Sequence, residues 1–265
     1  MRSALGLAIF CAAILAQPAA GQSGDIALAG HISEAMAAKV HAAFGDGKPH
    51  TLHLTSSGGE EAPALAIARE MADHRAALVV EGVCAGPCAN YLFRAAARRT
   101  ILPGALVIFS TTATSRLAMV PSRRRDEIRP DYLRMAELEK KLPGNAALLL
   151  EPQLRLGTQC YSLTSRDGTG RAYINYRADF VGWIPSRAYL EKADLRISGF
   201  WPRTADAFQA ALKSAFPGGL RGEIRFAGTN TPAPAAKSAA DLAAIPECDK
   251  GSPARAATPP PAKVR

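Results

Sequence analysis

Two cysteines are the residues whose type and spacing could most directly do chemistry. Cys84 and Cys88 flank Gly86 and Pro87 in the stretch VVEGVCAGPCANYLFRAAARR, residues 79–99. The apolar run before the turn predicts a buried strand, and the run after it predicts a packed helix. Many hydrolases place a nucleophile at such a turn, because a helix N-terminus favours an anion. The stretch therefore poses two alternatives, a thiol nucleophile at Cys88 or a disulfide that clamps the turn.

A nucleophilic Cys88 would need a lowered thiol pKa and a general base. The helix N-terminus would lower the pKa, but every histidine precedes the turn in sequence: His31, His41, His50, His53 and His74. His53 alternates with Leu52 and Leu54, so we expect it to face away from them as a packed or surface residue. Oxidised to Cys84, Cys88 would be inert. We favour the disulfide or a buried thiol over the nucleophile.

The first residues predict export. Residues 1–21 contain one basic residue, an apolar run over 4–15 and a small-residue cleavage region, which together form a signal peptide. The apolar run is shorter than the roughly 20 residues that span a bilayer. We expect a periplasmic or secreted protein with no stable membrane span after cleavage.

Four cysteines remain after cleavage, an even number that suits disulfides in an oxidising compartment. Spacing leaves the pairing open, and the least strained choice joins Cys84 to Cys88 and Cys160 to Cys248. Neither a second close pair nor a histidine stands at ligand spacing, so we expect no metal. The sequence indicates no cofactor.

The formal charge of +9, or +8 without Arg2, is spread along the chain. Its one dense cluster, residues 123–125, is followed at once by Asp126 and Glu127, with few aromatic residues nearby. We interpret this cluster as a solvated surface loop rather than an anionic-partner site. Nucleic acid is not an expected partner of an exported protein.

Strands and helices alternate about every 25 residues through the first half, which predicts an α/β fold with a largely parallel sheet. Expected strands lie at 26–29, 52–54, 78–83 and up to 109, and expected helices follow Ser33, Gly59 and Pro87. Residues 113–129 look irregular, and a charged helix follows over 130–142. Residues 148–201 predict strands around a Gly-rich turn at 167–170, and 205–216 predict a helix.

The ordered set GHI, SSGGEEAPALAIARE and CAGPCANYLFRAAARRTILPGALVIFS resembles the Clp protease proteolytic subunit and its exported relatives in the ClpP/crotonase superfamily. The resemblance covers residues 25–112 and continues more weakly to 142. It implies a repeated strand-helix spiral with a mostly parallel sheet, followed here by a strand-containing C-terminal extension. We expect a signal peptide at 1–21, a core at 22–147, an extension at 148–228 and a mostly disordered tail at 229–265.

The resemblance also assigns roles around the turn. Gly58 and Gly59 stand where the family's glycines supply N–H groups to an oxyanion, and such a donor can lower the barrier by ~3 kcal/mol. The simpler interpretation is that this turn only needs positive φ. The serine position falls at Gly86 or Pro87, and the histidine position at Phe109, followed by Ser110.

Two of the three catalytic roles are therefore vacant, since none of these residues offers an activated hydroxyl or a base. The third, an acid, stays unassigned among Asp167, Asp179 and Asp194.

These observations favour a protein without serine-protease activity, a pseudoenzyme. It would act as a binding or scaffold protein, with a peptide or protein in the vestigial cleft formed by Gly58, Gly59, Gly86, Pro87 and Phe109. A hydrolase using Cys88 or another nucleophile is the alternative. A crotonase-type catalyst would need only the oxyanion donors, but export makes a coenzyme A substrate hard to supply. A third hypothesis is an assembly protein, a homo-oligomer that associates through the helix at 130–142.

Overall fold

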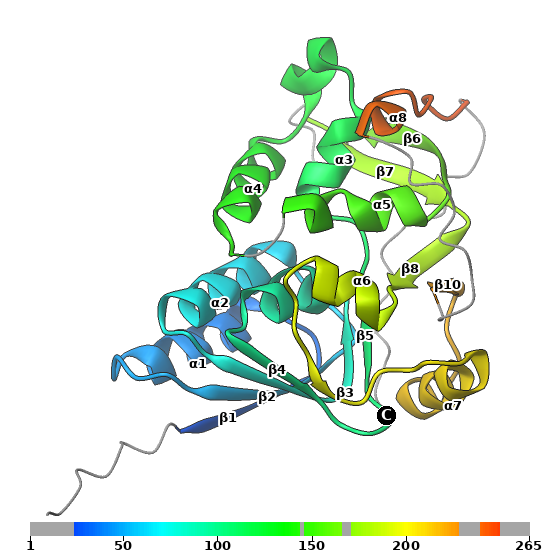
Figure 1. The fold of residues 1–265 in the computed structure, drawn as a ribbon. Helices are drawn as coiled ribbons and strands as arrows, with labels where there is room; N and C mark the ends of the chain where they lie inside the picture. The colour runs from blue at the N-terminus through cyan, green and yellow to red at the C-terminus, as the bar shows by residue number, and fades with distance from the viewer. Residues whose placement is uncertain (1–23, 144–145, 166–170, 228–238, 250–265) are drawn as a thin grey trace, which may run out of the picture.

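The computed structural model describes residues 24–143, 146–165, 171–227 and 239–249. Its centre is a six-stranded sheet in the order β1-β2-β3-β4-β9, with β5 also paired to β3 (Figure 1). All of these pairings are parallel. The strands are β1 Asp25–Ala29, β2 Thr51–Ser56, β3 Ala77–Ala85, β4 Arg98–Ile101, β5 Leu106–Ile108 and β9 Ser198–Gly199. The predicted α/β class with a mostly parallel sheet is confirmed.

Helices α1 (Glu34–Phe44) and α2 (Glu61–Asp73) pack on one face of this sheet (Figure 1). Helix α1 begins after Ser33, whose hydroxyl accepts the N–H of Met36 at 3.5 Å, as expected for an N-cap. The apolar stripes predicted for the two helices face the core. Their buried members include Val40, Phe44, Leu65, Ala68 and Met71.

Strand β3 leads into η1, a π-helix over Cys88–Phe93 in which every residue is buried. The helical backbone ends at residue 95, slightly earlier than predicted. Strand β4 follows at once. The sequence patterns had not distinguished β4 as a strand separate from β5.

The expectation of irregular chain over 113–129 is wrong. Helix α3 spans Ala113–Met119 and a 3-10 helix, η2, spans Ser122–Glu127. Two contacts explain α3: Thr112 and Ser115 form a capping box, and Glu139 accepts the first two N–H groups of the helix at 2.8 Å. Glu139 belongs to α4 (Pro130–Lys141), which the sequence predicted.

The expectation of strand from residue 148 is also wrong in its first part. Residues there form the 3-10 helix η3 (Ala146–Leu149) and helix α5 (Glu151–Arg155), with Pro152 in the first turn of α5. Strands β6 (Thr158–Thr164) and β7 (Tyr173–Ala178) then form an antiparallel hairpin, followed by β8 (Phe180–Ile184). The Gly-rich turn lies outside the described residues.

The C-terminal elements, from α6 onward, pack against the strands and core formed by the earlier part of the chain. The remaining elements are α6 Arg187–Lys192, the predicted α7 Ala205–Ala215, β10 Glu223–Phe226 and α8 Ala239–Ala243. Strand β10 pairs with β8, and β9 extends the central sheet beside β4. In the expected disordered tail, 239–249 is ordered: Leu242 of α8 is buried, and Cys248 is bonded to β6.

The remaining tail residues and the expected signal peptide lie outside the described residues. Among the helices the structure does describe, none has the length and apolar character to cross a membrane.

Candidate functional site

The two-glycine turn after β2 lies against the turn that carries the cysteines. Gly58 has φ +123°, and a Cβ placed there would lie 3.5 Å from the carbonyl oxygen of Ala85 and 3.8 Å from Cδ of Pro87. A Cβ on Gly59 would lie only 2.4 Å from the backbone nitrogen and oxygen of Ile32. Glycine is therefore required at both positions by the backbone itself, whatever role their N–H groups have.

Two of the backbone donors near the turn are already hydrogen-bonded within the fold. The N–H of Gly58 donates to Oγ of Ser56 at 3.2 Å, and the N–H of Gly86 donates to the carbonyl of Ile108 at 2.9 Å. Pro87, the next residue, has no N–H to offer. The pair of converging free donors that an oxyanion hole needs is not provided by Gly58 and Gly86.

Gly86 leaves room opposite a serine. It has φ +56°, and a Cβ built on it would lie 3.4 Å from Oγ of Ser110. Asn90, which is buried, holds this segment: its Oδ1 accepts the N–H of Ser110 at 3.1 Å, and its Nδ2 donates to the carbonyl of Thr111 at 2.9 Å. Sequence reasoning missed Asn90, although an amide within an otherwise apolar helix start was its visible signal.

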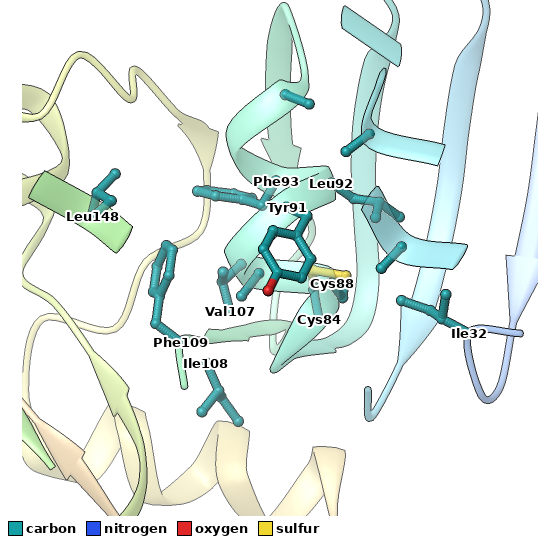
Figure 2. Packing of buried hydrophobic residues seen from close by; sticks show 14 of the residues in the cluster. Ile32, Cys84, Cys88, Tyr91, Leu92, Phe93, Val107, Ile108, Phe109 and Leu148 are labelled. Carbon is teal, nitrogen blue, oxygen red and sulfur yellow. A yellow bond between two sulfur atoms is a disulfide. The ribbon is translucent and has the colours of Figure 1, made fainter. Parts of the chain in front are cut away.

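Both predicted disulfides are formed. The Cα atoms of Cys84 and Cys88 are 5.2 Å apart and those of Cys160 and Cys248 are 5.0 Å apart. Figure 2 shows the first disulfide beside Tyr91 within the buried cluster. Cys84 and Cys88 are both fully buried, so in this oxidised state neither sulfur is a free thiolate.

Phe109, where the resemblance would place a base, is a core residue. It is completely buried, and its ring centroid lies 6.0 Å from that of Phe93 and 6.2 Å from that of Trp183. Its N–H and carbonyl both bond to the backbone of Trp183 at 2.8 Å. Figure 2 shows the ring turned into the apolar cluster with Phe93. A side chain in this place stabilises the fold and cannot transfer a proton.

The histidines lie elsewhere in the fold. His53 contacts Glu81 at 2.8 Å, and its side chain points to the face of the sheet opposite Leu52 and Leu54, as predicted. The hydrogen bond that the Asp46 carboxylate accepts from Nε2 of His50 raises the pKa of this buried histidine. His41 and His74 pair with Glu70, and His31 is exposed. Among the described contacts, no histidine reaches Cys88 or Ser110.

A buried charge network lies next to the turn, and the sequence analysis did not anticipate it. The hydroxyl of Tyr91 donates to Glu139 at 2.5 Å and also contacts Glu61 at 3.1 Å, while Arg116 pairs with Glu61. Burial raises the pKa values of both Glu61 and Tyr91. Because each of these groups already has a protein partner, the network joins α2, η1, α3 and α4 as a brace.

The structure does not assign any of the three candidate aspartates to the turn. Asp167 lies outside the described residues. Asp179 accepts a hydrogen bond from Gln159 at 2.6 Å, and Asp194 is a turn residue with φ +59°. Neither contacts Gly86 or Ser110 among the interactions of the described residues.

Two open surface hollows are described, and both lie away from the turn. One, of about 270 Å³, is lined by α7 and the residues up to Leu220, and the other, of about 260 Å³, lies between α1 and α2. Within the described residues no three His, Cys, Asp or Glu side chains are grouped to hold a metal ion.

The geometry thus brings Gly58, Gly59, Gly86, Pro87 and Ser110 together, separates them from every histidine described, and buries Phe109. Comparison with models of known protein families and with curated proteins finds no match for the chain.

Proposed function

We propose that the chain is an exported ClpP/crotonase-like protein that has no serine-protease activity and acts as a binding or scaffold protein. One observation carries the proposal: the resemblance places the attacking hydroxyl at Gly86 or Pro87 and the base at Phe109, and Phe109 is a fully buried aromatic residue. The order of strands, helices and glycine turns supports the superfamily assignment. The two disulfides support export to an oxidising compartment.

The expected loss of rate is large because several catalytic contributions are missing together. General-base catalysis contributes about 10²–10⁴-fold, and one oxyanion donor contributes about 10²–10³-fold. The N–H groups of Gly58 and Gly86 are already bonded inside the fold. Without an attacking group or a base, and with these two N–H groups engaged, we expect no acceleration of acyl transfer at this turn.

The same geometry favours a scaffold over a deep ligand pocket. The hollows beside α7 and between α1 and α2 are not lined by Gly58, Gly86 or Ser110. We expect a bound peptide or protein to contact the surface of the vestigial cleft. Such binding would rest on the shape of a rigid, disulfide-clamped turn.

Labelling with a fluorophosphonate probe tests the proposal directly. The oxidised chain should show no labelled serine by mass spectrometry after long incubation, while an active serine hydrolase in the same tube is labelled completely. A heat-unfolded sample of the chain provides the background. Labelling of any serine that requires the native fold would contradict the proposal.

A hydrolase with an unidentified nucleophile is the second candidate, and the position of Ser110 favours it. The Ser110 hydroxyl faces the space left by Gly86, and Nδ2 of Asn90 lies 3.4 Å from it. Asn90 cannot accept the serine proton as a base, so we expect no turnover. Ester hydrolysis that disappears in Ser110→Ala but persists in Ser162→Ala would establish this alternative instead.

The thiol version of the alternative has its own test. Iodoacetamide without reductant should leave Cys84, Cys88, Cys160 and Cys248 unmodified, because both pairs are oxidised. Rapid alkylation of Cys88 in the native chain would support a thiol enzyme.

A further inference from the structure

The central sheet is covered on one face only within the described residues. The face toward α1 and α2 carries side chains that are at most 6% exposed: Ile26, Leu28, Leu52, Leu54, Leu78, Val80 and Ile101. The opposite face, here called the open face, is half-buried to exposed throughout and consists of Asp25, Ala27, Ala29, Thr51, His53, Thr55, Ala77, Val79, Glu81, Arg98 and Thr100. Figure 1 shows no helix below β1 and β2 on this side. Parallel sheets are normally covered on both faces, so a partner is expected here.

The open face carries a negative charge on its β1 edge and a positive charge on β4. In the strand register, Asp25 on β1 aligns with Thr51 on β2, then Ala77 on β3, then Arg98 on β4. These four residues form one row across the sheet. The Asp25 side chain is 71% exposed, and its carboxylate lies 3.7 Å from Nε2 of His53. Arg98 is exposed, and its guanidinium makes no ion pair within the described residues.

We propose that the open face binds the open face of a second copy of this chain, around a two-fold axis parallel to the strands. Such an axis preserves the strand direction and reverses the strand order, so that β1 of one copy lies over β4 of the other. Asp25 then faces Arg98 of the second copy, and the symmetry repeats this contact with the roles exchanged. The charge pattern is self-complementary, which is the reason for choosing a second copy over an unrelated partner.

The side chains between the charged ends suit close sheet packing. Ala27, Ala77 and Val79 are small or β-branched, and stacked sheets lie about 10 Å apart. His53 and Glu81 are already hydrogen-bonded to each other at 2.8 Å, so they do not bring unpaired groups into the contact. The inference depends on this sheet face alone and is independent of the proposed loss of catalysis.

The size of the face predicts a weak dimer. Four strands about 4.8 Å apart, with exposed rows repeating about every 6.8 Å, give roughly 400 Å² per copy. The total of roughly 800 Å² is below the 1,200–2,000 Å² typical of stable complexes. We therefore expect a monomer–dimer equilibrium that responds to protein concentration.

Sedimentation equilibrium of the oxidised, leader-free chain over a wide concentration range tests the inference. Reversing one charge turns both attractive pairs into repulsive ones, so Arg98→Asp and Asp25→Arg should each raise the dimer Kd about tenfold. The double variant D25R/R98D exchanges the two charges and should restore the original Kd. Arg69→Asp, a charge reversal on an exposed position of α2, is the matched control and should have no effect.

Circular dichroism and urea unfolding show whether each variant keeps its fold. Recovery in the double variant would itself exclude misfolding as the cause of dissociation. The inference is overturned if the chain stays monomeric at every concentration. It is equally overturned if a dimer forms whose Kd is the same in both single variants, or if the double variant does not recover.

Discussion

Replacing Gly86 with serine should reduce stability without creating activity. Gly86 has φ +56°, in the left-handed region where a residue with a Cβ costs about 1–2 kcal/mol. The added Cβ would lie 3.4 Å from Oγ of Ser110, a contact that small shifts can relieve. We therefore expect Gly86→Ser to lower the free energy of unfolding by about 1–2 kcal/mol, measured by urea denaturation.

Gly86→Ala separates the backbone effect from the hydroxyl. It places the same Cβ in the same conformation, so its loss of stability should match that of Gly86→Ser to within about 0.5 kcal/mol. Neither variant should react with a fluorophosphonate probe. The introduced hydroxyl would have Phe109 in place of a base, and Pro87 after it lacks the N–H that could hold an oxyanion.

Two results would refute this reasoning. A loss below about 0.5 kcal/mol in both variants would show that the positive φ of Gly86 is not a constraint in the folded protein. Probe labelling of Gly86→Ser above the level of Gly86→Ala would show that some group near the turn can activate a hydroxyl there. In the second case, the lack of a hydroxyl at Gly86 would be the main obstacle to a reactive nucleophile at this turn.

Three further changes test other parts of the account. Phe109→Ala should cost about 3–5 kcal/mol in urea denaturation as a core truncation, whereas a loss below about 1 kcal/mol would place its ring outside the core. Cys84→Ala/Cys88→Ala should cost about 2 kcal/mol, the value expected for so short a closed loop, and the wild-type chain under reductant serves as comparison. The hydrogen bond with Asp46 raises the pKa of His50 in the folded protein. The protonated His50 therefore stabilises the fold fully below pH 6.5, and this contribution is lost as the pH rises through the folded-state pKa. NMR titration should therefore give a His50 pKa above 6.5 that falls in Asp46→Asn, and an unchanged value would contradict the assignment.

Local patterns were sufficient to predict the first five elements, from β1 to β3. The alternation of Leu52 and Leu54 with polar residues identified β2 and the direction of His53, because side chains alternate across a strand. Ser33 marked the start of α1 because its hydroxyl can satisfy a free N–H group. The disulfide between Cys84 and Cys88 followed from cysteine number, proximity and the predicted compartment.

Long-range contacts explain what the sequence did not reveal. Helix α3 depends on Glu139, which lies 26 residues beyond the Ala113 N–H that it accepts, so a polar stretch looked irregular. Tyr91 looked like one more apolar residue of a helix, although its hydroxyl joins two carboxylates from distant helices. The proximity of Ser110 to Gly86 likewise arises from the pairing of β5 with β3, which no local pattern encodes.

If the proposed function is correct, catalysis at this turn would be difficult to introduce because the groups concerned have structural partners. Freeing the N–H of Gly58 or of Gly86 would break a hydrogen bond inside the fold, at about 1 kcal/mol each. Replacing Phe109 by a base would open the aromatic core and bury a polar ring without a partner. A serine at Gly86 adds the cost of its positive φ. Each change alone is therefore expected to lower stability without supplying the other groups that catalysis needs.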